Sequence, residues 1–202
     1  MTTVVIPFAG ADGKTRLHES RRLRHELSLA MLGDVIAGAR RVGAVRVVTP
    51  DPDGAAIARD AGAEHVDDPG GGQAAAVEAG LAGLDPGAIL IANADVPCAV
   101  PADFRALLAA TPAGGIALVE ALDGTTNALS ISAPSLFAPV YGPDSARRFL
   151  EHARSLGVDA VSAVVPNLGD DVDTLDDLHR LHLRLGPRTQ ACVAGLDAQA
   201  LL

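Results

Sequence analysis

The stretch "AILIANADVP" (residues 88–97) begins with an apolar run and ends in a polar turn. A short apolar run bounded by turn-forming residues is typical of a strand that is buried on both faces of a sheet. Asp95 follows this run, and a carboxylate at the end of a central strand is well placed to bind a divalent cation. Aspartate is also common in turns that contain proline, so a purely structural role stays open for Asp95.

Short apolar runs alternate with longer amphipathic stretches on both sides of this strand. We expect further strands at 3–7, 45–49, 64–66, 115–120, 127–132 and 160–165, and helices at 18–42, 54–62, 73–84, 101–111, 143–157 and 174–186. This alternation predicts an α/β fold with a mostly parallel central sheet and helices on both faces. We find no dividing linker, and we expect one domain over residues 1–187 and a C-terminal tail over 188–202.

The composition narrows the class of protein. The 202 residues carry a net charge of −9, which argues against a general nucleic-acid-binding surface. Aromatic residues make up only 2 %, so the core must be built from Val, Leu, Ile and Ala. Because no apolar run is long enough to cross a bilayer, we expect a soluble cytoplasmic protein with no membrane partner. The spacing of Cys98 and Cys192 is not that of a metal site, and both are expected to be free thiols.

The segment "PFAGADGKTRL" (7–17) follows the first predicted strand and contains Lys14, the only lysine of the chain. Gly10 and Gly13 would let the backbone approach a ligand closely and present N–H groups to phosphate. Lys14 and Arg16 add positive charge beside a helix start. The spacing is not that of a Walker A loop, and a single lysine on a solvated loop can also arise by chance.

The segment before the last predicted helix is rich in acidic residues. Thr174 and Asp177 have the spacing of a capping box and mark the start of that helix. Asp171 and Asp173 lie at alternate positions before it, so they project to the same side if the chain is extended. Asp95 and Asp173 could hold one Mg²⁺ between them, and a solvated acidic loop is the alternative.

Small polar residues gather in two later segments. Thr126 and Asn127 offer hydrogen-bonding groups, and Gly142 permits close backbone approach. Ser145 opens a predicted helix, where its hydroxyl and the backbone N–H groups suit a phosphate or carboxylate. Simple N-capping by Asp144 or Ser145 is the alternative. We find no Ser-His-Asp or Cys-His arrangement and no zinc spacing in the sequence.

Five short motifs occur in a fixed order: "KTRL" (14–17), "ADVP" (94–97), "TNAL" (126–129), "YGPDS" (141–145) and "DVDT" (171–174). With them the chain resembles the phospholactate/phosphoenolpyruvate guanylyltransferases, which take part in the biosynthesis of the deazaflavin hydride carrier coenzyme F-420. The resemblance runs from about residue 4 to residue 183. It implies a nucleotide-diphospho-sugar-transferase-like fold, a modified Rossmann sheet.

The resemblance also implies a reaction. GMP would pass from GTP to a small phosphorylated acid, 2-phospho-L-lactate or phosphoenolpyruvate, and pyrophosphate would leave. The implied roles are Lys14 and Arg16 in catalysis, Gly10 and Gly13 at the GTP phosphates, Thr49 and Gln73 at the base and ribose, Asp95 and Asp173 as Mg²⁺ ligands, and Thr126, Asn127, Gly142 and Ser145 at the acceptor. A homodimer is an expectation that rests on the family alone.

Two departures from the family pattern leave alternatives open. The chain has "DGTTNAL" where the family often has "GTGTNAL", and Gly72–Gln73 where "LN" is common. The sequence therefore does not decide whether the base is guanine. It also does not decide whether the acceptor is 2-phospholactate, phosphoenolpyruvate or 3-phosphoglycerate. Another nucleotidyltransferase of the same fold, using CTP or a different acceptor, is one alternative, although its "GG-x-S-x-R-x-G" loop is missing. A non-catalytic nucleotide-binding module is another, against which Asp95 and Asp173 argue.

Overall fold

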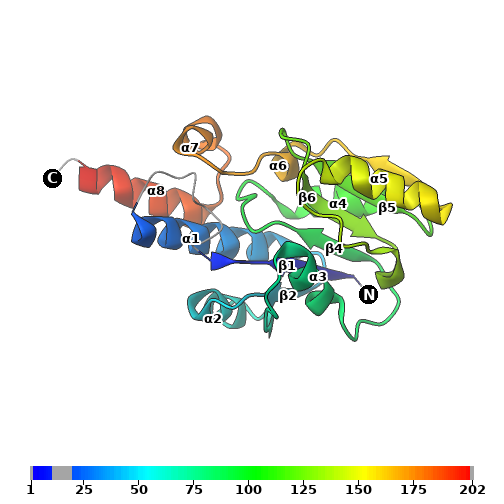
Figure 1. The fold of residues 1–202 in the computed structure, drawn as a ribbon. Coiled ribbons are helices and arrows are strands. Elements are labelled where there is room, and N and C mark those ends of the chain that lie inside the picture. Colours follow the sequence, from blue (N-terminus) through cyan, green and yellow to red (C-terminus); the bar gives the residue numbers. More distant parts are fainter. Residues whose placement is uncertain (1, 11–19, 201–202) are drawn as a thin grey trace.

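The computed structural model describes residues 2–10 and 20–200. In these residues seven strands form one sheet in the order β3-β2-β1-β4-β6-β5-β7 (Figure 1). The strands are β1 (Thr3–Pro7), β2 (Ala44–Val48), β3 (Glu64–Val66), β4 (Ile89–Ala92), β5 (Ile116–Glu120), β6 (Thr126–Ile131) and β7 (Ala160–Ser162). The predicted α/β fold with a mostly parallel sheet is confirmed.

The strand β6 runs against its neighbours. It is antiparallel to both β4 and β5, whereas β1 pairs in parallel with β2 and β4, and β5 in parallel with β7. The register pairs Ala92, the last residue of β4, with Ala128 near the start of β6. As a result, Thr126 and Asn127 at the start of β6 lie beside the carboxyl ends of β1 and β4.

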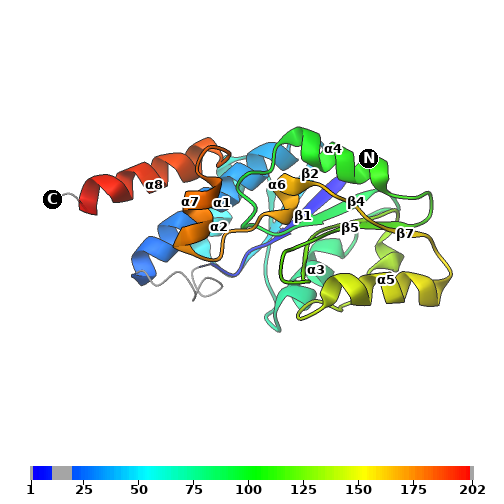
Figure 2. The same cartoon turned by 90° about the horizontal axis from the view of Figure 1, so that it is seen from above.

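Helices cover both faces of the sheet, as predicted (Figure 2). They are α1 (Arg21–Ala39), α2 (Pro52–Asp60), α3 (Gln73–Leu81), α4 (Pro101–Ala110), α5 (Ser145–Leu156), α6 (Pro166–Gly169), α7 (Leu175–Leu181) and α8 (Pro187–Ala200), with a short 3₁₀ helix, η2, at Pro134–Leu136. The helices α3 and α5 lie on one face, and α1, α2, α4 and α6 lie on the other. None of the described helices is both long and apolar enough to span a membrane.

The two cores follow from the alternation of side chains along each strand. In β1, Val4 and Ile6 pack toward α1 and α4, whereas Val5 packs toward α3. A single phenylalanine is completely buried on each side, Phe104 from α4 and Phe149 from α5. Aliphatic residues supply most of the remaining core, as the low aromatic content predicts.

A third apolar cluster joins α1, α7 and α8 beyond the edge of the sheet. Leu27 and Met31 of α1 pack in it with Leu178 and Leu181 of α7 and with Val172. This cluster fixes the segment that connects α6 to α7, which carries the acidic residues.

The residues expected to form a C-terminal tail are helical from Pro187 to Ala200 and lie along α1 (Figure 1). The first turn of α8 is held by Asp34 of α1, a buried residue. Its carboxylate accepts hydrogen bonds from the backbone N–H groups of Arg188 at 3.0 Å and Thr189 at 2.8 Å. The division into a domain at 1–187 and a tail at 188–202 stays a prediction.

Some elements differ in length from the sequence prediction. The helix α7 ends at Leu181 and β7 ends at Ser162, earlier than expected, and α6 is an additional short helix. A four-residue helix such as α6 is too short to give a hydrophobic period, so the sequence pattern could not indicate it. The predicted capping box is confirmed, because the side chains of Thr174 and Asp177 each accept from the other residue's backbone N–H.

Candidate functional site

Three aspartates meet at the carboxyl end of β4. Asp95 follows this strand, and Asp171 and Asp173 come from the segment between α6 and α7. Each offers a carboxylate oxygen, and these three oxygens lie within 4.8 Å of one another. The structure therefore brings Asp95 and Asp173 together, as expected from the sequence, and adds Asp171. Three hard oxygen donors at this spacing suit a small divalent cation such as Mg²⁺.

Backbone contacts fix this arrangement. Val172 lies between the two later aspartates, and its side chain is buried in the third apolar cluster. Its N–H donates to the main-chain carbonyl of Asp95 at 2.9 Å, which ties the two acidic segments together. Successive residues of an extended chain point to opposite sides, so Asp171 and Asp173 lie on the side opposite to Val172. Asp171 and Asp173 therefore point away from the apolar cluster, and this alternation was the signal in the sequence that could have added Asp171 to the predicted ligands.

Burial and neighbouring negative charges raise the pKa of one of the three aspartates, Asp171. Burial, followed by the negative charges of Asp95 and Asp173, raises the pKa of Asp171 to about 6, and a hydrogen bond from Asn127 partly opposes this. Like charges that share a site raise one another's pKa, and a bound cation removes that cost. The chemistry of the three donors therefore fits a metal ion.

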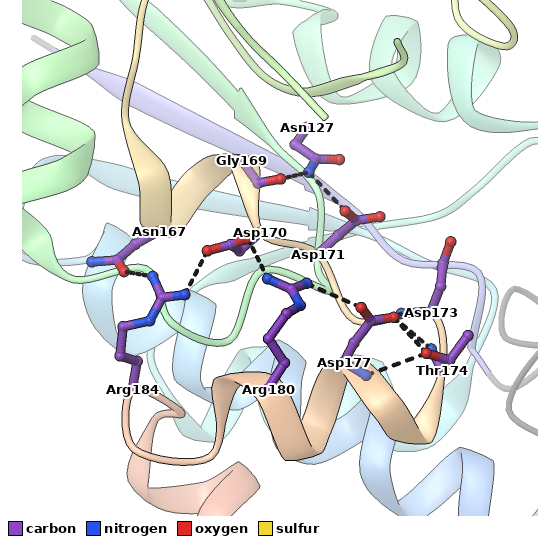
Figure 3. A network of polar contacts seen from close by, with 10 residues as sticks. All are labelled: Asn127, Asn167, Gly169, Asp170, Asp171, Asp173, Thr174, Asp177, Arg180 and Arg184. Carbon is purple, nitrogen blue, oxygen red and sulfur yellow. Dashed lines mark hydrogen bonds and ion pairs between the residues drawn. The ribbon is translucent and has the colours of Figure 1, made fainter. Parts of the chain in front are cut away.

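A chain of side-chain amides connects the aspartates to α3. Gln73 Nε2 donates to Asn93 Oδ1 at 2.7 Å, and Asn93 Nδ2 donates to Asn127 Oδ1 at 3.2 Å. Asn127 Nδ2 then donates to Asp171 Oδ1 at 3.2 Å and to the carbonyl of Gly169 at 3.2 Å (Figure 3). Asn93 was not predicted as a site residue, although its position directly after the apolar run of β4 could have indicated it.

A cavity of about 240 Å³ lies beside this chain, between the ends of β1 and β4 and the start of α3. Gly10, Gln73, Asn93 and Asp95 are among the residues that line it. The helix α3 begins after Gly72, which has a φ of 89° and makes no side-chain capping bond. Asp95 belongs to the acidic cluster and also lines the cavity. A ligand in the cavity would therefore lie next to a cation held by the aspartates.

The residues predicted at the GTP phosphates are only partly described. Gly13, Lys14 and Arg16 lie outside the described residues, so their predicted roles rest on the sequence. Gly10 has a φ of 71°, and a Cβ atom there would lie 2.5 Å from Asp51 Oδ2. Only glycine meets both conditions without strain.

Thr49, predicted near the base and ribose, is buried at the end of β2 and is not among the residues that line the cavity. Its hydroxyl accepts a hydrogen bond from the backbone N–H of Asp51 at 3.0 Å. In the structure Thr49 therefore shapes the turn that leads into α2.

The predicted acceptor residues lie around the start of α5. Ser145 Oγ donates to Thr126 Oγ1 at 3.1 Å, and both residues are buried. Asp144 occupies the N-cap position with a φ of 55°, but its side chain makes no capping bond. Gly142 has a φ of 106°, and the guanidinium of Arg148 donates to two carbonyls of the same loop. Thr126 binds Ser145, and the next residue, Asn127, donates to Asp171. The strand β6 thus connects the predicted acceptor residues to the acidic cluster.

A second group of polar residues connects α1 to α2. His25 Nε2 lies 3.0 Å from Asp53 Oδ2, and its Nδ1 lies 3.5 Å from Asp51 Oδ2. The other oxygen of Asp51 caps α2 by accepting from two backbone N–H groups. Each ring nitrogen of His25 faces a different carboxylate, so this group connects α1 to the start of α2.

Comparisons with known proteins agree with the predicted resemblance. The family model described as "Guanylyl transferase CofC like" matches residues 2–191. Phosphoenolpyruvate guanylyltransferases from Nocardia farcinica and Roseiflexus castenholzii are 37 % and 38 % identical to the chain. The first alignment covers 89 % of this chain and 84 % of the relative, and the second covers 85 % of each.

Solved structures share the fold. A candidate nucleotide-diphospho-sugar transferase from Desulfovibrio desulfuricans G20 superposes with a TM-score of 0.76 at 17 % identity, over 98 % of this chain and 95 % of the other. The predicted nucleotide-diphospho-sugar-transferase-like fold is thus confirmed. By its match to the family model and its curated relatives, the chain belongs to the CofC-like guanylyl transferase family.

Proposed function

We propose that the chain transfers GMP from GTP to phosphoenolpyruvate and releases pyrophosphate, in the biosynthesis of coenzyme F-420. The names of its curated relatives support the acceptor and the nucleotide. The observation that carries the proposal is the cluster of Asp95, Asp171 and Asp173 beside the cavity at the end of β4. A non-catalytic nucleotide-binding module would have no need of three carboxylates gathered at this place.

In the proposed reaction, a phosphate oxygen of the acceptor attacks the α-phosphorus of GTP in line. The bond from the α-phosphorus to the oxygen that bridges to the β-phosphorus breaks, and its electron pair leaves with pyrophosphate. The product contains a new diphosphate that links the three-carbon acid to guanosine. Because the acceptor phosphate is already ionised near pH 7, the nucleophile needs no general base. Catalysis then depends on positioning and on neutralising charge.

The three aspartates are the proposed ligands of Mg²⁺, since all offer oxygen donors within 4.8 Å of one another. Bound Mg²⁺ would offset negative charge on the phosphates of GTP and on the departing pyrophosphate. Asn127 would orient the Asp171 carboxylate through its amide N–H. On the sequence evidence, Lys14 and Arg16 would bind the leaving pyrophosphate from the other side.

The proposed nucleotide and acceptor positions lie on either side of the acidic cluster. Gln73 and Asn93 would form the floor of the nucleotide site, because both line the cavity and hydrogen-bond to each other. The start of α5, near Gly142 and Ser145, would bind the anionic acceptor. The backbone N–H groups of Ser145 and Ala146 already donate to the carbonyls of Gly142 and Gly124, so the positive end of the α5 dipole is what favours an anion there.

A matrix of initial rates of pyrophosphate release tests the proposal. It combines GTP or CTP with phosphoenolpyruvate, 2-phospholactate or 3-phosphoglycerate, with Mg²⁺ or with EDTA. We expect the highest rate with GTP, phosphoenolpyruvate and Mg²⁺, and loss of activity in EDTA. Asp95→Asn should be inactive, whereas Asp85→Asn, the same change at an exposed residue before β4, should be as active as the wild type. A preference for CTP, or full activity in EDTA, would contradict the proposal.

A further inference from the structure

Two arginines, Arg180 of α7 and Arg184 in the turn after it, bind the acidic segment (Figure 3). Arg180 Nη1 donates to Asp170 Oδ1, and Arg184 Nη2 donates to Asp170 Oδ2, both at 2.6 Å. The Asp170 side chain is only 16 % exposed. Both oxygens of this carboxylate are therefore occupied by guanidinium groups, and charge-assisted bonds of this kind are the strongest among protein hydrogen bonds.

Each arginine also binds a second residue. Arg184 Nη1 donates to Asn167 Oδ1 at 3.0 Å, and Asn167 Nδ2 donates to Asp103 of α4 at 3.1 Å. Arg180 Nη2 donates to Asp177 Oδ1 at 3.0 Å. The two arginines thus connect α7 to α6 and, through one amide, to α4.

The same contacts enclose Asp171 and Asp173, two of the three aspartates of the candidate metal site. Asp170 lies directly before Asp171, and it faces the arginines whereas Asp171 faces Asn127 (Figure 3). On the other side, Asp177 Oδ2 accepts from the backbone N–H groups of Asp173 at 3.2 Å and Thr174 at 2.9 Å. Arg180 therefore holds the chain at both ends, through Asp170 and through Asp177.

We infer that Arg180 and Arg184 are positioning residues that fix Asp171 and Asp173 for the divalent cation. They act through Asp170 and Asp177, whose carboxylates accept hydrogen bonds from the two guanidinium groups. The inference rests on the proposed function, because that function assigns the cation to these aspartates. Mutation of residues that position metal ligands commonly lowers the metal affinity about 10- to 100-fold.

Charge alone predicts the opposite effect of removing an arginine. Loss of a positive charge near the acidic cluster leaves Asp170 less neutralised, which increases the attraction for a cation. Loss of positioning lets Asp171 and Asp173 move apart, which decreases the affinity. The sign of the change in metal affinity therefore distinguishes a positioning role from a purely electrostatic one.

The test is a titration with Mn²⁺, followed by electron paramagnetic resonance of the free ion, without nucleotide or acceptor. We expect Arg184→Gln and Arg180→Gln each to raise the Kd for Mn²⁺ about 10-fold. The control, Arg46→Gln, removes an ion pair with Glu64 of β3 and bonds to the carbonyls of Gly80 and Ala82 at the end of α3. It should keep the wild-type Kd. Thermal unfolding by circular dichroism shows that each variant is folded.

Asn167→Ala supplies a variant without a change in charge. It removes the second anchor of Arg184 and should also weaken Mn²⁺ binding, by a smaller factor. Arginine variants that bind Mn²⁺ as tightly as the wild type, or more tightly, would overturn the inference and leave the proposed function intact. A wild-type protein that binds no Mn²⁺ at this site would overturn both.

Discussion

Replacing Asp171 by asparagine should stabilise the metal-free protein while it impairs the metal site. The ionised carboxylate is half-buried and faces the charges of Asp95 and Asp173, and these raise its pKa from 3.8 to about 6. Asparagine has nearly the same shape and carries no charge. Its Oδ1 can still accept the hydrogen bond that Asn127 donates to Asp171.

The size of the effect follows from the pKa. One pKa unit corresponds to about 1.36 kcal/mol, so the rise from 3.8 to about 6 corresponds to about 3 kcal/mol. Solvent screening at this partly exposed residue reduces the figure, and we expect about 2 kcal/mol at pH 7.5. A chain of this size gains about 2–4 °C in melting temperature per kcal/mol, so Asp171→Asn should melt about 4–8 °C higher in EDTA.

The pH dependence gives a second readout. Because the folded protein holds the Asp171 proton more tightly than the unfolded chain, the wild type loses stability as pH rises from 3.8 to about 6. The advantage of Asp171→Asn should therefore be constant above pH 6 and should shrink as pH falls toward 4. Added Mg²⁺ should raise the melting temperature of the wild type and have little effect on the variant.

The matched control is Asp176→Asn, the same change at an exposed position in the first turn of α7. It should give no stabilisation. The reasoning would be refuted if Asp171→Asn melted at or below the wild-type temperature in EDTA at pH 7.5. It would also be refuted if the difference between the two proteins grew as pH fell from 6 to 4.

Two further predictions concern residues that follow β1 in the sequence. Lys14→Ala should lower kcat about 100-fold, as does loss of other groups that stabilise charge in a transition state, and near-normal turnover would show that the lysine is incidental. Gly10→Ala should destabilise the fold by about 2 kcal/mol, because alanine is strained at a φ of 71° and displaces Asp51, which caps α2. Urea unfolding measures this loss, and an unchanged midpoint would contradict it.

The sequence predicted the parts of the site that depend on one segment at a time. The apolar run of β4 predicted a buried strand with Asp95 at its end, and alternation before α7 indicated that Asp171 and Asp173 share a side. Parallel strands end at one edge of a sheet, so the meeting of these segments could be expected. The five motifs supplied the family.

Other features depend on pairings that no local pattern records. The antiparallel direction of β6 places Asn127 beside Asp171, and a strand's direction is set by its neighbours rather than by its own residues. Asp34 of α1 is buried and holds α8, whose residues lie far from it in the sequence. Arg180 of α7 and Arg184 after it bind Asp170, which lies on another segment, and local spacing does not reveal such a partner.

The most direct test of the proposed function follows the reaction of GTP and phosphoenolpyruvate by ³¹P nuclear magnetic resonance in the presence of Mg²⁺. We predict that the resonances of both substrates fall together while pyrophosphate appears. Two new, mutually coupled resonances should mark the unsymmetrical diphosphate that joins the acid to guanosine. Unchanged substrates, or inorganic phosphate formed in place of pyrophosphate, would contradict guanylyl transfer to this acceptor.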